Sequence, residues 1–253
     1  MKITETLSFS FKDELVRIHA RPLYRHPSSF FWRKCLSVNN QFCQAVVNVG
    51  LLSWEQMINA SCRYCVGTSK NGGVIFWQID HEGRVHDGKV MYYLPNCHRN
   101  KAKDIHPTWV SSILRRRNQQ SKEPHITSHC FFGTHLLPGT NAAVCLVEAE
   151  KTAFILSEKY PQNLWLATGG LTEVQPDKFR PLRGRKVIMF PDTDPDGTTF
   201  RYWFETADFV MHAPFWKGSP SIRVSSLLEK EATPDQKHRK IDLIDYLLEY
   251  HKQ

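Results

Sequence analysis

The chain of 253 residues contains no apolar run near the length of about 18 residues that a membrane-spanning helix requires. Its N-terminal stretch, MKITETLSFSFKDEL, also lacks the apolar centre of a signal peptide, because Glu5, Asp13 and Glu14 interrupt it. No G-x-x-x-x-G-K-[ST] motif occurs, so we expect no fused helicase motor. Internal repeats and low-complexity tracts are missing as well. These absences predict a cytoplasmic globular protein of mixed α and β structure without a membrane partner.

Cysteine is scattered and odd in number, which favours reduced thiols over a disulfide framework. The seven cysteines stand at positions 35, 43, 62, 65, 97, 130 and 145. Cys62 and Cys65 have the spacing of half a zinc site, but Cys97 and His98 are adjacent and therefore poor partners on one tetrahedral ion. Buried thiols are the preferred interpretation, and the zinc interpretation of Cys62 and Cys65 stays open.

Positive charge is distributed unevenly along the chain. Residues 1–140 hold 18 Lys and Arg against 9 Asp and Glu, whereas residues 141–253 hold 15 against 16. A basic half beside a near-neutral half indicates that one part attracts a polyanion, so we expect DNA or RNA as a partner. The candidates for backbone contacts are Lys89, Arg99, Lys101, Lys103, Arg115, Arg116 and Arg117. For any one of them, a solvated surface charge is the alternative.

Two domains are predicted, residues 1–128 and 129–253, separated by the polar segment 118–128. The first is a smaller α+β domain with helices at 39–49, capped by Asn39, from 53, where Ser53 and Gln56 have capping-box spacing, and at 107–117. Its strands at 64–69, 74–80 and 84–94 are joined by glycine-containing turns at 71–73 and 81–83. In the second, strands at 144–148, 164–168, 186–190 and 221–224 alternate with helices at 150–160, 197–212 and from 233. Such alternation predicts an α/β fold with a parallel sheet flanked by helices.

Carboxylates follow two of the predicted buried strands. Glu148 comes directly after the apolar run VCLV, and Asp192 and Asp194 come directly after VIMF. Because the carboxyl ends of parallel strands form the ligand crevice of such sheets, we expect these side chains to meet there. Hard oxygen ligands without histidine favour Mg²⁺ or Mn²⁺. The alternative is an acidic strand-to-helix turn in which aspartate serves as a helix cap, with Gly197 allowing a tight entry into the helix.

The segments VEAEKTA, WLATGG and VIMFPDTDPDG, in this order, resemble the Toprim domain of DnaG-type primases, topoisomerases and related nucleases. Matched by motif, the resemblance implies that Glu148 is the catalytic glutamate and that Asp192 and Asp194 are the metal-binding, catalytic aspartates. Asp196 takes the place of a further acidic metal ligand. The pair Gly169-Gly170 takes the place of the turn after the second strand. One departure is Ala149, where the family usually has glycine.

The resemblance continues upstream of the acidic motifs. The stretch VIFWQIDHEGRVHDGKVMYY, followed by CFFGTHLL, is similar to the region that precedes the Toprim domain in DnaG-type primases. From about Asn39 to Trp203 the chain also resembles an uncharacterised bacterial Toprim-like family carried by mobile elements. This implies a role in DNA replication, with replication or mobilisation proteins as further partners. The chain shows no zinc ribbon of the kind that begins DnaG-type primases.

The resemblance implies a metal-dependent enzyme acting on phosphodiesters or nucleoside triphosphates. Lys151, near the start of a predicted helix, could contact a phosphate, and an exposed helical lysine is the alternative. Three functions stay open at this point: primase-like nucleotidyl transfer on a DNA template, cleavage by a metal-dependent nuclease, and binding of nucleic acid without catalysis. We expect the first.

Overall fold

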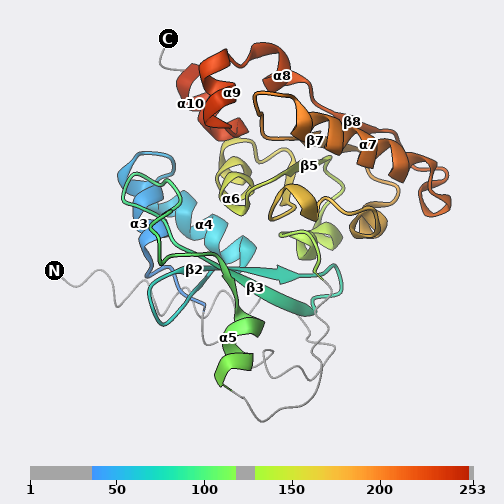
Figure 1. The fold of residues 1–253 in the computed structure, drawn as a ribbon. Helices are drawn as coiled ribbons and strands as arrows, with labels where there is room; N and C mark the ends of the chain where they lie inside the picture. Colours follow the sequence, from blue (N-terminus) through green and yellow to red (C-terminus); the bar gives the residue numbers. More distant parts are fainter. Residues whose placement is uncertain (1–35, 118–128, 251–253) are drawn as a thin grey trace. The chain divides into compact units, whose positions relative to one another are not determined.

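A computed structural model describes residues 36–117 and 129–250 of the chain (Figure 1). The chain divides into two compact units, Met1–Cys130 and Phe131–Gln253, and each is described by itself. Mixed α and β structure, with a parallel sheet flanked by helices and a separate antiparallel sheet, confirms the predicted fold class. The nucleic-acid role predicted for the first domain stays a prediction.

The described part of the first unit contains two capped helices, α3 (Gln41–Asn48) and α4 (Trp54–Tyr64). The cap of α3 is Asn40, whose side chain accepts a hydrogen bond from the backbone of Cys43, and the predicted cap Asn39 is wrong by one residue. Ser53 opens α4 with a capping box, as predicted. Helix α4 extends to Tyr64 and ends at Cys65, which adopts a left-handed conformation (φ 54°). The strand predicted at 64–69 is therefore only two residues long.

An antiparallel sheet forms the rest of this unit, in the order β1-β2-β3-β4. Its strands are β1 (Gly67–Thr68), β2 (Val74–Ile79), β3 (Val85–Met91) and β4 (Thr108–Trp109), and α5 (Val110–Arg117) follows β4 directly. The hairpins at 71–73 and 81–83 lie where the glycine-containing turns predict them. Helix α5 starts later than predicted, because Trp109 is paired with Lys89 at the edge of the sheet.

Gly88 lies in close contact with the core on one face of this sheet. A Cβ atom there would lie 2.7 Å from Cε3 of Trp77 and 2.8 Å from Cγ2 of Ile75, both buried. Gly88→Ala is therefore expected to lower the free energy of unfolding by about 1–3 kcal/mol in urea denaturation. Gly139→Ala is the control, because a Cβ atom there meets nothing within 4 Å. Equal losses in both variants would contradict the packing argument.

The second unit contains a four-stranded parallel sheet in the order β6-β5-β7-β8. Its strands are β5 (Val144–Val147), β6 (Leu164–Ala167), β7 (Val187–Phe190) and β8 (Ile222–Val224). The helices between them are α6 (Glu150–Lys159), after β5, and α7 (Thr198–His212), after β7. Short 3-10 helices cover Thr134–Gly139, Leu171–Glu173, Pro176–Leu182 and Pro214–Trp216. The weak strand predicted at 221–224 is the edge strand β8.

Strands β5 and β6 are buried on both faces, as their continuous apolar sequences require, whereas β7 alternates between buried and half-buried residues. One face carries Val144, Leu146 and Met189, and it packs against Trp203 and Val210 of α7. The other face includes Trp165 and Phe190, whose rings lie 5.9 Å apart. Helix α6 lies against β5 and β6, with Phe154 and Leu156 fully buried. The carboxyl ends of the strands are thereby held in fixed positions.

The C-terminal segment consists of three short helices, α8 (Leu227–Glu231), α9 (Pro234–Arg239) and α10 (Leu243–Tyr250). The predicted capping box at Thr233 and Gln236 is confirmed. The prediction of one continuous helix from residue 233 is wrong, because Lys240 adopts a left-handed conformation (φ 55°) and breaks it. Within the described part of the chain, no helix has the length and apolarity needed to cross a membrane.

Candidate metal site at the carboxyl end of the parallel sheet

Two adjacent strands bring Glu148 and Asp192 to the same edge of the sheet. Strands β5 and β7 are parallel neighbours, and their last paired residues are Val147 and Phe190. Glu148 follows this pair by one residue and Asp192 by two. Strand β6 lies on the other side of β5, so the strand order reverses at this point, where ligands bind in open α/β sheets. The sheet therefore places these two carboxylates at the predicted crevice.

The turn after β6 fixes the backbone at Glu148. Gly169 donates its N–H to the carbonyl of Glu148 at 2.8 Å, and Thr168 donates its N–H to the carbonyl of Val147 at 3.0 Å. Gly169 has a φ of 90°, a conformation that favours glycine. Ala149, which caps α6, has a φ of −91°, so the methyl group at this position causes no backbone strain. Gly169 thus helps to position the backbone of Glu148.

Asp192 lies in a strongly negative environment. Withdrawal from water raises the pKa of Asp192 well above its usual value, and the carboxylates of Glu148, Asp242 and Asp245 raise this pKa further. The ammonium group of Lys151 opposes these effects. Glu148 and Asp192 therefore act on one another electrostatically, as the sequence predicts, and the excess negative charge favours a cation at this position.

Asp242 and Asp245 are site residues that sequence reasoning missed. The backbone N–H of Thr193 donates to the carbonyl of Ile241 at 3.2 Å, which brings the start of α10 beside the loop after β7. Asp242 is buried and accepts a hydrogen bond from Oγ1 of Thr152 at 2.6 Å. In sequence, the spacing of Asp242 and Asp245 indicates an ordinary helix start, and Asp242 does accept the N–H of Asp245 at 2.8 Å. The packing of α10 on α6 is what places these two residues beside the candidate site.

The carboxylate of Asp194 accepts hydrogen bonds from the backbone around the start of α7. Its Oδ1 accepts the backbone N–H groups of Asp196 (2.9 Å) and Thr198 (3.1 Å), and its Oδ2 accepts that of Thr199 (2.6 Å). Desolvation opposes ionisation, but hydrogen bonds from the side chain of Thr199 and from these backbone N–H groups lower the pKa of Asp194 to about 2. The alternative in which aspartate caps the helix is therefore what the structure shows at this position. A role of Asp194 as metal ligand stays a prediction.

Asp196 and Gly197 complete the acidic loop between β7 and α7. Asp196 is exposed, and Gly197 has a φ of 63° immediately before α7. A left-handed residue at this point allows the tight entry into the helix that the sequence predicts. Gly170 follows Gly169 in the turn after β6. The metal-binding role predicted for Asp196 stays a prediction.

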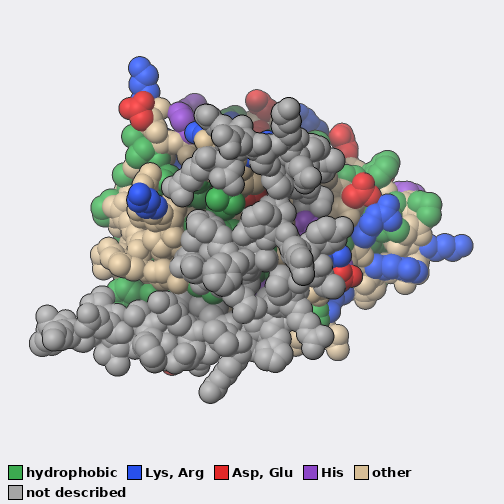
Figure 2. All heavy atoms as spheres, turned by 90° about the horizontal axis from the view of Figure 1, so that it is seen from below, with side chains coloured by type: hydrophobic (Ala, Val, Ile, Leu, Met, Phe, Trp, Pro, Cys, Tyr) green, Lys and Arg blue, Asp and Glu red, His purple; other side chains and the backbone are tan. Residues whose placement is uncertain are grey.

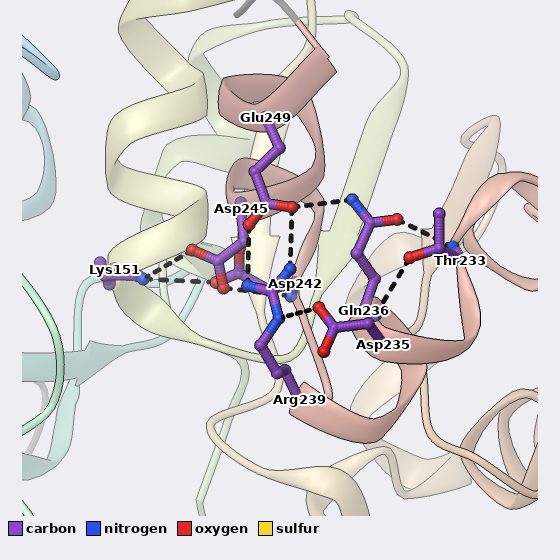
Figure 3. A network of polar contacts seen from close by, with 8 residues as sticks. All are labelled: Lys151, Thr233, Asp235, Gln236, Arg239, Asp242, Asp245 and Glu249. Atoms are coloured by element: carbon purple, nitrogen blue, oxygen red, sulfur yellow. Dashed lines mark hydrogen bonds and ion pairs between the residues drawn. The ribbon is translucent and has the colours of Figure 1, made fainter.

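Lys151 points toward the acidic residues of α10 (Figure 3). Its Nζ lies 3.5 Å from Oδ2 of Asp242 and 4.0 Å from Oδ1 of Asp245, and its side chain is 13% exposed. Burial alone would raise the pKa of Asp242, but Lys151 and the hydroxyl of Thr152 bring this pKa below its ordinary value. The alternative of an exposed helical lysine is wrong, and contact with a phosphate stays a prediction.

The donor chemistry of this crevice fits a hard dication, because carboxylate oxygens are the preferred ligands of Mg²⁺ and Mn²⁺. Among residues 36–117 and 129–250, however, no group of three or more His, Cys, Asp or Glu side chains is arranged to hold a metal ion. Glu148 and Asp192 interact electrostatically, and their role as metal ligands stays a prediction. Substrate oxygens would complete a coordination shell of such an ion.

The candidate nucleic-acid contacts of the first unit have different exposures. Lys89 is half-buried in β3, whereas Arg99, Arg115 and Arg116 are exposed, and the side chain of Arg117 lies outside the described residues. On the face drawn in Figure 2, several Lys and Arg side chains stand at the right edge next to Asp and Glu side chains, and others stand singly at the left. Their role in binding stays a prediction.

Of the described cysteines, Cys43, Cys65, Cys97 and Cys145 are buried, whereas Cys62 and Cys130 are partly exposed. Desolvation by burial raises the pKa of Cys43 and of Cys65 to about 12. The burial of Cys65 agrees with the buried-thiol interpretation, and a zinc role of Cys62 and Cys65 stays open. Cys35 lies outside the described residues.

Fold and site together define an α/β protein with carboxylates at the switch point of a parallel sheet. The family model described as "Domain of unknown function (DUF6371)" matches residues 40–193, more than half of the chain, so the chain belongs to this family. The search of the curated proteins found no significant match.

The solved structures that are similar to the chain include three of primases. The primase domains bound to an RNA/DNA hybrid and dTTP in a bacteriophage T7 lagging-strand DNA polymerase structure share 13% identity, with 76% of this chain and 81% of that chain covered and a TM-score of 0.43. The primase fragment of the bacteriophage T7 primase-helicase protein shares 18% identity, covering 72% and 63%, with a TM-score of 0.44. The Aquifex aeolicus primase, with zinc-binding and RNA polymerase domains, shares 11%, covering 96% and 64%, with a TM-score of 0.46.

The chain therefore spans less than two thirds of the length of the last two of these chains. At these identities and TM-scores the likeness carries no argument about activity.

Proposed function

We propose that the chain is a metal-dependent enzyme that catalyses primase-like nucleotidyl transfer on a DNA template. The observation that carries this proposal is the placement of Glu148 and Asp192 after two adjacent parallel strands, at the point where the strand order reverses. A pair of carboxylates at such a point of the sheet suits a divalent cation and the phosphates that accompany it.

Glu148 and Asp192 would hold the ion, and Asp194 and Asp196 are the further candidate ligands from the sequence. The chemistry that bound Mg²⁺ or Mn²⁺ supplies is neutralisation of phosphate oxygens and stabilisation of the attacking and leaving oxygens. Glu148 is also the candidate for proton transfer to or from a reacting oxygen. Lys151, in the first turn of α6, would contact a phosphate at the positive end of this helix.

Nucleic acid would be bound by the basic first unit. Lys89, Arg99, Arg115, Arg116 and Arg117 are the candidate backbone contacts. Each neutralised phosphate makes the affinity for nucleic acid more sensitive to salt. A role in the replication of mobile elements, with replication or mobilisation proteins as partners in the cytoplasm, belongs to this same proposal.

Two other functions compete with this one. A metal-dependent nuclease would use the same carboxylate pair, because phosphodiester cleavage needs the same stabilisation of charged oxygens. A module that binds nucleic acid without catalysis is favoured by a specific observation: both carboxylate oxygens of Asp194 already accept backbone N–H groups.

One assay separates the three functions. The protein is incubated with Mg²⁺ or Mn²⁺, labelled nucleoside triphosphates and labelled single-stranded DNA, and the products are resolved on a denaturing gel. Nucleotide products longer than one unit support nucleotidyl transfer, and shortened DNA identifies a nuclease. Neither product, together with DNA binding that is unchanged in Asp192→Ala, identifies a binding module and overturns the proposal.

A further inference from the structure

Lys151 is a positively charged residue that lies beside the acidic residues of the candidate site. It lies in the first turn of α6, three residues after Glu148, and its side chain turns toward the start of α10 (Figure 3). With an exposed fraction of 13%, this side chain is largely withdrawn from water. A lysine is rarely buried to this extent without a partner of opposite charge.

The partners of Lys151 are carboxylates that border the candidate site. Its ammonium group lies 3.5 Å from Asp242 and 4.0 Å from Asp245, and neither distance is a short hydrogen bond. Asp242 also accepts the hydroxyl of Thr152 at 2.6 Å, which fixes this carboxylate on α6. Lys151 is therefore held as a single positive charge among several negative ones.

The start of α10 is fixed independently of Lys151. Arg239 of α9 pairs with Glu249 of α10 through two hydrogen bonds of 2.8 and 2.9 Å, and with Asp235 through one of 2.8 Å (Figure 3). The carbonyl of Ile241 accepts the N–H of Thr193 in the loop after Asp192. The C-terminal helices thus keep Asp242 in place whether or not Lys151 carries a charge.

We infer that Lys151 is the internal counter-ion of the acidic crevice, and that a divalent cation bound at Glu148 and Asp192 competes with it. The inference rests on the proposed function, since it requires that the crevice take a metal ion. Binding of the dication adds positive charge next to Lys151 and weakens its attraction to the carboxylates. The ammonium group then becomes available to a phosphate that enters with the metal. Because such coupling is reciprocal, removing the charge of Lys151 strengthens metal binding.

The test measures Mn²⁺ affinity by calorimetry in the absence of nucleotide, so the result does not depend on activity. Lys151→Met is expected to bind Mn²⁺ about tenfold more tightly than the original protein, within the usual range of coupling between sites. The metal-free variant is expected to melt at a lower temperature, because its carboxylates have lost their counter-ion. Lys151→Arg keeps the charge and is expected to keep the original affinity.

Lys159→Met is the matched control, because Lys159 is an exposed lysine on the same helix. Its Mn²⁺ affinity should not change. Lys151→Gln serves as a second charge-free variant if Lys151→Met does not fold. Unchanged or weaker binding in the charge-free variants, with measurable binding by the original protein, overturns the counter-ion role and leaves the proposed metal site standing. Absence of Mn²⁺ binding in every protein overturns both.

Discussion

Asp192→Asn is expected to lose turnover by at least about 100-fold, while its metal-free form melts at the same temperature as the original protein or higher. The loss of activity follows because one of the two central carboxylates is gone, and even residues that orient metal ligands cost up to about this factor. The gain in stability follows because Glu148, Asp242 and Asp245 disfavour a charge at Asp192. An amide of the same shape removes that repulsion.

Turnover is measured in the nucleotide-incorporation assay, and the melting temperature by circular dichroism with a chelator present. Glu205→Gln is the control, because Glu205 is an exposed acid on α7. A fall in the melting temperature of Asp192→Asn beyond that of the control would show that Asp192 supports the fold. Retained turnover would remove Asp192 from the site.

Asp194→Ala is expected to lower the free energy of unfolding by about 2 kcal/mol, the upper range for loss of a helix cap. Three backbone N–H groups at the start of α7 would lose their acceptor. The same carboxylate predicts a pH dependence, because its folded pKa of about 2 lies below the ordinary value of 3.8. Its contribution to stability is present above pH 4 and is lost as the pH falls toward 2.

Urea denaturation at pH 7 and near pH 2 checks this prediction. The stability difference between the original protein and Asp194→Ala should be large at pH 7 and should shrink at the lower pH. A constant difference at both pH values would contradict the role of the ionised carboxylate. The two aspartates of the D-T-D motif are thus expected to change stability in opposite directions.

The succession of parallel strands along the second unit could be predicted because each strand is a short apolar run followed by a turn. Strand Val187–Phe190 ends at the predicted residue and Val144–Val147 ends one residue before the predicted end, so Glu148 and Asp192 could be placed at one edge. The antiparallel hairpins of the first unit followed from their glycine turns. Local patterns were sufficient in these places because the local and the tertiary preferences agree.

Other features depend on tertiary packing that no local pattern contains. The left-handed conformation of Lys240 breaks an apolar stripe that is otherwise helical, so the start of α10 could not be located. The role of the Lys151 side chain could not be predicted, because its partner Asp242 lies 91 residues further along the chain and comes close to it only by the packing of α10 on α6. The two roles within the D-T-D motif could not be separated, because both aspartates follow the same strand.

The central claim is that Glu148 and Asp192 together hold a divalent cation. An anomalous difference map of crystals soaked in Mn²⁺ tests it most directly, because manganese is located without reference to activity. The account predicts a peak between the carboxylates of Glu148 and Asp192, and loss of this peak in crystals of Asp192→Asn. A peak bound by other residues, or no peak at this edge of the sheet at saturating Mn²⁺, would contradict it.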